Sequence, residues 1–370
     1  ITCPAAGVAE SFVSRFFDGH FDNYLDDNQF GASKSRSTEL ALIKLCHFIF
    51  ESSDDCGNFI RLVFVDYIKA FDLIDHNVLH TKFLECDFPT WLTSWSLAFL
   101  KDRTQFVKVG DFTSGSLVTN AGAPQGTRAG SNDFRLLIND LRCDAFYIKY
   151  VDDVSMVTVA DDPLDSSMQT AVQQLVEWSK LNSLKLNGKK TKEMILHFGR
   201  RFHTNIIPNI VAAGEKIERV NEFKLLGVII RSDLSWCSHV KYIVSKASRR
   251  IFVLSTLIRS GVSTSDILAV YCSLVRSVLE YASTVWHCGL TKEQSSEIEK
   301  VQKRCLRLIF PNLSYSNALQ LAGLERLTER RERAAHALFQ EIKRPNHILH
   351  NLLQSKDKNE TKINTRNQYP

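Results

Sequence analysis

The stretch YIKYVDDVSMV runs from Tyr147 to Val157 and places two adjacent aspartates, Asp152 and Asp153, between runs of β-branched and aromatic residues. Each run has the pattern of a β-strand, so the two aspartates are expected at the tip of a hairpin. Ionised carboxylates are costly in an apolar neighbourhood, and adjacent ones repel each other. The stretch therefore raises the question of what neutralises this pair.

A further aspartate, Asp66, follows a short apolar run, LVFV (residues 62–65). If this strand lies beside the hairpin in one sheet, three carboxylates converge at one edge. A pair of divalent cations such as Mg²⁺ would relieve their repulsion, and two such ions can align a hydroxyl with a phosphorus centre. The alternative is a hairpin turn that merely contains two aspartates, which is the preferred reading of an isolated Asp-Asp pair.

The composition is that of a folded protein with two or three packed subdomains: 370 residues, 44% hydrophobic and 24% charged. The formal net charge of +5 is unevenly distributed. The segment Lys241–Arg344 contains 17 Lys and Arg against nine Asp and Glu, whereas the remainder contains 29 against 32. A basic C-terminal part suits binding to a polyanion, although solvated helix surfaces produce the same pattern.

Nine cysteines are present, and no two of them form a Cys-x-x-Cys pair. This pattern indicates neither a disulfide framework nor a zinc site, and it favours a reducing intracellular compartment, nucleus or cytoplasm. No apolar run is long enough to span a bilayer and no signal peptide is visible, so we expect no membrane partner. The first residue, Ile1, suggests a fragment of a longer product.

Hydrophobic periodicity predicts an α+β body that ends near residue 236, followed by helices. Helices are expected over residues 10–25, 38–50, 132–141 and 166–182, and strands over 62–65, 146–150, 154–159, 194–199 and 223–236. Asp75 is expected to cap a further helix, and two strands joined by a Gly/Ser turn are expected over 105–126. The predicted divisions are residues 1–236, a helical basic region over 237–345, and a polar tail over 346–370.

Five segments, in order, resemble motifs A to E of reverse transcriptases. They are FVDYIKAFDLIDH (64–76), NAGAPQGTRAG (120–130), YVDD (150–153), LKLNGKKTKEMIL (184–196) and FKLLGVII (223–230). Upstream of them, QFGASKSRST (29–38) resembles the fingers motif of retroelement enzymes. Five ordered motifs are far more specific than any one of them.

The details resemble non-LTR (LINE-type) retrotransposons, close to the jockey-like group. Motif A has the form AFD-x-x-DH and motif E contains LLGV. The segments LEYAS-x-VWH (279–287) and VQKRCLRLIF (301–310) are similar to that group's region after the palm. The resemblance therefore covers nearly the whole chain.

This resemblance implies a right-hand polymerase: partial fingers, a palm with an antiparallel sheet, and a helical thumb matching the basic region. The implied activity is that of an RNA-directed DNA polymerase, which extends a primer 3′-hydroxyl by two-metal nucleotidyl transfer. Its cofactor would be two Mg²⁺ ions, with Mn²⁺ as a substitute. Its partners would be an RNA template, a DNA primer, dNTPs and other parts of the same retroelement polyprotein.

Carried over to this chain, the resemblance makes Asp66, Asp152 and Asp153 the catalytic, metal-binding triad. The backbone carbonyl of Tyr67 would be a further metal ligand. Phe71 matches the aromatic residue that stacks under the sugar and excludes a ribose 2′-hydroxyl, although a core aromatic is the simpler reading of a lone Phe.

The remaining expected sites lie in loops and turns. Gln125 and Gly126 match the motif B pair that contacts the incoming nucleotide, with glycine allowing close backbone approach. Lys190 or Lys192 would serve motif D as a proton donor to pyrophosphate. Leu226 would belong to the primer grip.

Gly227 would share the primer grip with Leu226. Lys34 and Arg36 sit where fingers bases meet the triphosphate or template, and a solvated loop is the equal alternative.

The chain departs from the family pattern in two places. After motif B, many relatives continue with Leu-Gly-Pro, whereas here Thr127–Ser131 follows without a proline. The N-terminal fingers element is also absent, and neither an endonuclease, an RNase H nor a zinc knuckle is visible, as expected for an N-terminally truncated copy. A catalytically inactive nucleic-acid-binding relic is therefore the alternative. An RNA-templated RNA polymerase is disfavoured by Phe71 and by YVDD in place of Gly-Asp-Asp.

Overall fold

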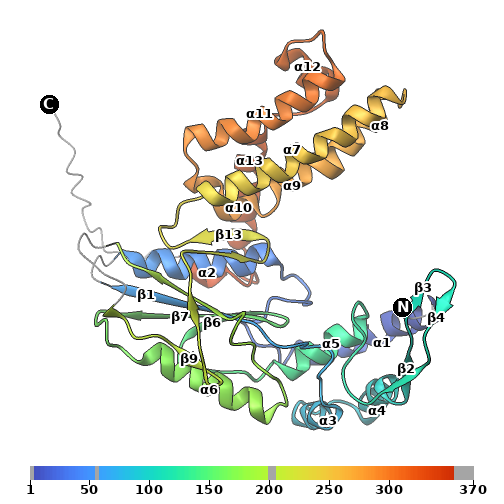
Figure 1. Cartoon of the computed structure of the whole chain (residues 1–370), viewed down its shortest axis with the longest axis vertical. Coiled ribbons are helices and arrows are strands. Elements are labelled where there is room, and N and C mark those ends of the chain that lie inside the picture. Colours follow the sequence, from blue (N-terminus) through green and yellow to red (C-terminus); the bar gives the residue numbers. More distant parts are fainter. Residues whose placement is uncertain (1–3, 55–57, 199–205, 354–370) are drawn as a thin grey trace.

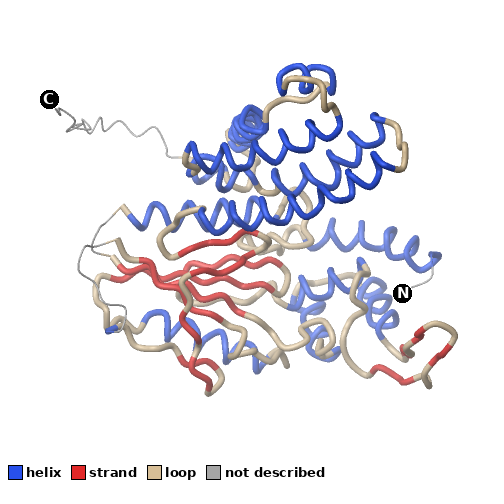
Figure 2. Tube along the Cα trace, turned by 45° about the horizontal axis from the view of Figure 1, so that its top comes forward, coloured by secondary structure: helices blue, strands red, loops and turns tan. Residues whose placement is uncertain are grey.

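The central sheet joins strands that are far apart in the sequence (Figures 1 and 2). The computed structural model describes residues 4–54, 58–198 and 206–353. Its main sheet has the order β11–β8–β1–β7–β6. The strands are β1 (Phe59–Val65), β6 (Phe146–Tyr150), β7 (Asp153–Ala160), β8 (Lys192–Leu196) and β11 (Glu218–Arg219). Neighbours are antiparallel, as predicted, except that β11 runs parallel to β8 at the edge.

The register of β1, β6 and β7 brings the aspartate segments together. Val65, the last residue of β1, pairs with Val154, and Tyr150 pairs with Asp153 across the β6–β7 hairpin. The hairpin turn consists of two residues, of which Val151 has a φ of +58°. A β-branched residue rarely adopts this conformation, so the surrounding structure must hold the turn in place.

Helices cover both faces of the sheet, so β1 is buried along its whole length. Leu62 packs with α2 (Thr38–Ser53) on one face. Val63 packs with α6 (Ser167–Leu181) on the opposite face. In Figure 1, α2 lies above the sheet and α6 below it. Burial on both faces explains why this strand is a continuous apolar run rather than an alternating one.

Four further helices belong to the core on the α6 side of the sheet. They are α1 (Pro4–Phe21), α3 (His76–Glu85), α4 (Thr90–Leu100) and α5 (Arg128–Leu137). The predicted cap is confirmed, because the Asp75 carboxylate accepts hydrogen bonds from the amides of Asn77 and Val78. Helix α5 begins four residues earlier than expected, because the Thr127 hydroxyl accepts a hydrogen bond from the amide of Gly130.

A two-stranded ribbon connects α4 to α5 and projects beside α1 (Figure 1). It contains β2 (Arg103–Gln105), β3 (Lys108–Val109), β4 (Phe112–Thr113) and β5 (Leu117–Thr119). The expected turn at the Gly/Ser segment was wrong. The ribbon reverses at Gly110, whose φ of +60° is the left-handed conformation that glycine adopts readily, whereas Gly115 has no positive φ.

Small β-hairpins and a helical lobe complete the chain. The hairpins are β9 (Val211–Ala212) with β10 (Glu215–Lys216), and β12 (Glu222–Leu225) with β13 (Val228–Arg231). The lobe contains α7 (Cys237–Arg259), α8 (Thr264–Val270), the π-helix η2 (Tyr271–Arg276), α9 (Ser277–Glu280), α10 (Ser283–Trp286), η3 (His287–Gly289), α11 (Lys292–Ile309), α12 (Tyr315–Ala322), α13 (Leu327–Ile342) and η4 (His350–Leu352).

The lobe shares one hydrophobic core with the sheet. Trp286 and Ile243 of the lobe belong to the same buried cluster as Leu62 of β1. Leu349, which lies beyond the expected boundary at residue 345, is also fully buried in this cluster. The packed body therefore extends further than the composition of the tail suggested, and residues 354–370 lie outside the described residues. No helix in the described ranges is both long and apolar enough to cross a membrane.

Candidate active site

The three predicted aspartates lie at one edge of the main sheet. Asp66 follows the last residue of β1, Asp152 is in the β6–β7 turn, and Asp153 begins β7. Because β1 and β7 are hydrogen-bonded neighbours with Val65 opposite Val154, the two aspartate segments are adjacent. The structure therefore brings together the carboxylates that the sequence placed in separate motifs.

Burial and neighbouring carboxylates raise the pKa values of Asp152 and Asp153. Desolvation and the negative charges of Asp152 and Asp66 raise the pKa of Asp153 to about 6. Desolvation and Asp66 also raise the pKa of Asp152. The Asp153 side chain is accessible to solvent, yet nearby protein atoms exclude enough water to disfavour its charge. No basic side chain contributes to these two shifts, so the edge carries uncompensated negative charge.

One carboxylate oxygen at this sheet edge is buried without a partner in the described structure. The Oδ1 atom of Asp66 is buried and has no hydrogen-bond partner among the described residues. The pairing of Tyr67 with Leu186 uses the neighbouring main-chain groups, and the Tyr67 carbonyl oxygen accepts no main-chain hydrogen bond in the described chain. Carboxylate and carbonyl oxygens are the donors that hard divalent cations prefer.

To hold a cation together, the three aspartate side chains would have to rotate from their present positions. In the described ranges, no group of three or more His, Cys, Asp or Glu side chains is arranged to hold a metal ion. Carboxylate oxygens of the aspartates, together with the Tyr67 main-chain carbonyl oxygen, are the kinds of donor that a hard divalent cation prefers. The buried, unpartnered Asp66 oxygen and the mutual repulsion of the carboxylates both fit a bound cation.

The motif D segment encloses the backbone of Asp66. The amide of Asp66 donates a hydrogen bond to the Thr191 hydroxyl (3.3 Å), and its carbonyl accepts one from the amide of Asn187 (2.8 Å). Thr191 is completely buried. Sequence reasoning considered only the lysines of this segment, although the position of Thr191 and Asn187 within motif D was the available signal.

The two motif D lysines differ in their surroundings. The Lys192 ammonium group lies 2.6 Å from the Glu218 carboxylate and also donates to the Lys189 carbonyl (2.7 Å). Lys190 is exposed and forms no ion pair within the described chain.

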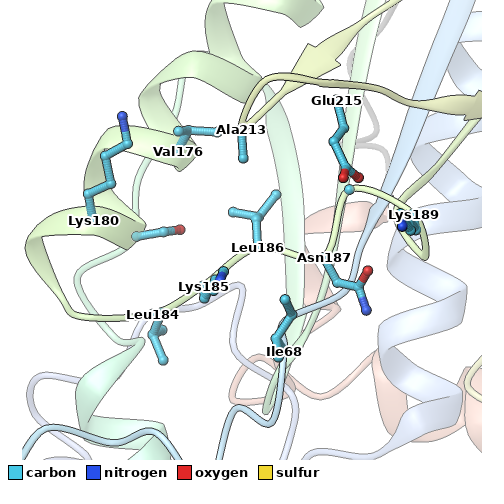
Figure 3. A pocket seen from close by; sticks show the side chains of 12 residues that line it. Ile68, Val176, Lys180, Leu184, Lys185, Leu186, Asn187, Lys189, Ala213 and Glu215 are labelled. Carbon is cyan, nitrogen blue, oxygen red and sulfur yellow. The ribbon is translucent and has the colours of Figure 1, made fainter.

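The neighbouring turn borders a cavity of about 430 Å³, lined by Ile68, Lys185 and other residues that Figure 3 shows.

Motif B is attached directly to motif A. The amide of Ala123 donates to the carbonyl of Phe71, and the amide of Gly122 donates to the carbonyl of Ile74, both at 2.8 Å. Gly122 has a φ of +81°, and a Cβ atom there would lie 2.6 Å from the carbonyl oxygen of Asp72. Only glycine permits this approach.

The predicted nucleotide-contacting residues lie around this attachment. The Phe71 ring stacks on Phe134 of α5, with ring centroids 4.9 Å apart, and is half-buried. Gln125 and Gly126 are exposed at the end of the loop, where Gly126 has a φ of +82° and open space around it. After this loop, in the segment without a proline, Thr127 is the N-cap residue of α5.

The two predicted fingers bases have different environments. The Arg36 guanidinium donates to the carbonyls of Asp26 (2.7 Å) and Gln29 (2.6 Å), so it braces its own loop. Lys34 is exposed and lines a cleft of about 790 Å³ between this loop and the end of α13. Sequence reasoning missed Gln29, whose side-chain oxygen accepts a hydrogen bond from the Val151 amide (3.2 Å) in the aspartate-bearing turn.

The sequence match to known families agrees with this geometry. Residues 10–230, more than half of the chain, match the family model described as reverse transcriptase (RNA-dependent DNA polymerase). This chain belongs to the reverse transcriptase family. The resemblance predicted from motifs A to E is therefore confirmed, and so is the expected right-hand polymerase fold, with the main sheet as its palm.

The curated relatives of this reverse transcriptase come from mobile elements. The RNA-directed DNA polymerase from mobile element jockey of Drosophila melanogaster is 24% identical over 295 residues, 76% of this chain and 31% of that protein. The Drosophila funebris counterpart is 22% identical over 298 residues, again 76% and 31%. The Pol polyprotein from type-1 retrotransposable element R1 of Bradysia coprophila is 23% identical over 197 residues, 51% of this chain and 19% of that protein. The chain thus spans about a third of the length of the jockey relatives or less.

Solved structures with a similar course of the chain include two telomerases in complex with a fragment of telomeric RNA. The enzyme from Candida albicans is 13% identical and has a TM-score of 0.42, with 87% of this chain and 59% of that chain covered. The enzyme from Candida tropicalis is 14% identical and has a TM-score of 0.43, with 88% and 48% covered.

In this reverse transcriptase, the predicted primer-grip residues form the turn of the β12–β13 hairpin. Leu226 has a φ of +46° and Gly227 a φ of +89°, as in a two-residue hairpin turn. The hydroxyl of Tyr281, in the helical lobe, donates a hydrogen bond to the Leu226 carbonyl (2.9 Å). The lobe therefore touches the turn directly.

Proposed function

We propose that this chain is the polymerase part of a non-LTR retrotransposon protein and extends a DNA primer on an RNA template. The primer 3′-hydroxyl oxygen attacks the α-phosphorus of a dNTP, the bond to the β-phosphate bridging oxygen breaks, and pyrophosphate leaves. Family membership supports this proposal. The observation that carries it is the convergence of Asp66, Asp152 and Asp153 at one sheet edge, with a buried, unpartnered oxygen on Asp66.

Asp66, Asp152 and Asp153, with the Tyr67 carbonyl, would hold two Mg²⁺ ions, or Mn²⁺ in their place. Bound there, such ions would supply positive charge that stabilises the attacking and leaving oxygens. The chain's own contribution is to position these oxygen donors: Thr191 and Asn187 hold the Asp66 backbone from both sides.

The segments attached to motif A would select the nucleotide. Phe71, supported by Phe134, lies five residues after Asp66 and would exclude a ribose 2′-hydroxyl. Gln125 and Gly126 would contact the nucleotide from the adjoining loop. Of the two motif D lysines, Lys190 is the better proton donor to pyrophosphate, because Lys192 is already paired with Glu218.

The remaining contacts would be made to the nucleic-acid backbone. The turn at Leu226–Gly227 would hold the primer, and Lys34, on the exposed side of its loop, would contact the template or triphosphate. The basic helical lobe would grip the primer–template duplex through phosphates, which leaves sequence choice to base pairing. The expected setting is the nucleus or cytoplasm, together with other parts of the same polyprotein.

The test is primer extension on an RNA template with dNTPs and Mg²⁺ or Mn²⁺, beside an Asp152→Asn variant. Extension by the wild type and not by the variant supports the proposal and its site together. Extension by both would mean that the site is wrong. Primer–template binding without extension would favour the inactive relic, and preferred incorporation of NTPs over dNTPs would favour an RNA polymerase.

A further inference from the structure

One tyrosine of the helical lobe meets two of the segments that surround the candidate active site. Tyr281 lies between α9 and α10, where Ala282, with a φ of +50°, interrupts the helical path. Its hydroxyl donates to the Leu226 carbonyl (2.9 Å) and lies 3.1 Å from the hydroxyl of Thr38, the first residue of α2. The hydroxyl thus connects the β12–β13 turn to the end of the fingers motif.

The turn is shaped to receive this ring. A Cβ atom at Gly227 would lie 2.9 Å from the Cε1 atom of Tyr281, so the ring occupies the space that a side chain would need. Glycine at position 227 therefore allows both the positive φ of the turn and the close approach of the Tyr281 ring.

The backbone that carries Tyr281 is itself anchored. The indole Nε1 of Trp286, which is completely buried, donates a hydrogen bond to the Tyr281 carbonyl (3.1 Å). Thr284 donates its hydroxyl to the Glu39 carboxylate on α2. These bonds join the segment around Tyr281 to the lobe core and to α2. The position of the Tyr281 hydroxyl is therefore fixed by an anchored main chain as well as by the packing of the ring.

The exposure of the ring distinguishes it from an ordinary core tyrosine. Tyr281 is 43% exposed, so its ring contributes little to the hydrophobic core. Its bonding partner, the Leu226 carbonyl, lies in the two-residue turn that the Leu225–Val228 pair closes, just beyond the β12–β13 ladder. The hydroxyl therefore acts on the position of the turn more than on the stability of the whole lobe.

We propose that Tyr281 is a positioning residue whose hydroxyl fixes the Leu226–Gly227 turn relative to the aspartate edge. Through this contact, the helical lobe would set where the primer 3′ end lies. The inference rests on the proposed function, in which this turn holds the primer. It assigns no contact with substrate to Tyr281 itself.

The first test is independent of catalysis. Peptide-level hydrogen exchange over residues 222–231 is compared between the wild type and Tyr281→Phe, which removes only the hydroxyl. Loss of one hydrogen bond is expected to speed exchange about two- to tenfold. The matched control is Tyr242→Phe, whose hydroxyl contacts Lys224 on a strand of the same hairpin (2.8 Å) rather than its turn. Unchanged exchange in Tyr281→Phe, or equal acceleration in both variants, would overturn the proposal.

The second test measures where the loss appears. In single-turnover extension, Tyr281→Phe is expected to lower the rate of nucleotide addition about tenfold, because the reacting atoms are misplaced. The Kd for primer–template should stay within about twofold, since the phosphate contacts of the lobe remain. A normal rate, or a loss confined to Kd, would overturn the proposal. If the wild type itself does not extend primers, the proposed function fails, while the exchange test still decides whether Tyr281 fixes the turn.

Discussion

The ammonium group of Lys149 lies 2.6 Å from the Oδ2 atom of Asp26, and both side chains are almost inaccessible to solvent. Lys149 also donates to the carbonyls of Ile138 (3.0 Å) and Asn139 (2.9 Å) at the end of α5. Lys149, the fourth of the five residues of β6, therefore ties the aspartate hairpin to the helix after motif B and to the segment before the fingers motif. Burial lowers the pKa of Lys149 to about 8, although Asp26 opposes this shift.

Replacing Lys149 by Met should destabilise the protein strongly. The variant leaves the buried Asp26 carboxylate with Arg142 as its one remaining ion-pair partner among the described residues, and it removes the donor from the end of α5. We expect the free energy of unfolding to fall by about 3 kcal/mol or more in urea denaturation. The control, Lys216→Met, changes an exposed lysine and should cost less than about 0.5 kcal/mol. Equal losses would show that the buried contacts of Lys149 do not matter.

Asp153→Asn should stabilise the metal-free protein at neutral pH. The pKa of Asp153 is about 6 in the folded state, above its ordinary value of 3.8, so its ionisation disfavours folding. The free energy of unfolding of the wild type should therefore fall as pH rises from about 4 to 6. The free energy of unfolding of the variant should not show this fall. Because the side chain is exposed and screened, we expect a gain of only about 1 kcal/mol at pH 7.5.

The measurement for Asp153→Asn is thermal or urea unfolding at pH 4 and pH 7.5, with chelator and then with Mg²⁺. A cation that binds the folded state stabilises it, so Mg²⁺ should reduce or reverse the advantage of the variant. An equal advantage at both pH values would contradict the electrostatic explanation.

Thr191→Val should impair polymerisation more than it impairs folding. The substitution keeps the shape but removes the acceptor for the Asp66 amide. We expect a loss of about 1–2 kcal/mol in unfolding free energy and a fall of about tenfold or more in extension rate. The matched control is Thr158→Val, because the buried Thr158 hydroxyl has no hydrogen-bond partner in the described structure. If both variants polymerise normally, Thr191 does not support the site.

Gly227→Ala should lower the free energy of unfolding more than Gly214→Ala does. Both glycines have positive φ values, +89° and +82°, so each alanine variant suffers about 1–2 kcal/mol of backbone strain. At Gly214 the new methyl group meets open space, whereas at Gly227 it meets the Tyr281 ring. Urea denaturation should therefore show an additional loss of about 1–3 kcal/mol for Gly227→Ala. Equal losses at the two sites would argue that the ring moves aside without cost.

Sequence reasoning located the aspartates because their signals are local. The alternation around Asp152, the apolar run before Asp66 and the Asp75 cap all depend on residues close in the chain. The adjacency of β1 and β7 was only a condition of the argument from sequence, and the structure meets that condition.

What the sequence could not show depends on distant partners. Thr191 is significant because its hydroxyl meets the Asp66 amide, 125 positions away. Its place in motif D links it to the site in general, but no local pattern indicates this particular partner. Arg36 resembled a phosphate-binding base, yet the fold directs its guanidinium to two carbonyls of its own loop. The reversal at Gly110 competed with a Gly/Ser segment of equal local merit, and strand pairing decided between them.

The continuous core beneath the helical lobe limits how the molecule can move. Trp286, Ile243 and Leu62 belong to one buried cluster, so swinging the lobe away from the sheet as a rigid body would expose that cluster to water. Palm and lobe are therefore expected to unfold as one cooperative unit. If the chain binds nucleic acid as proposed, the distance between the aspartate edge and the lobe would be set by this shared core rather than by a hinge.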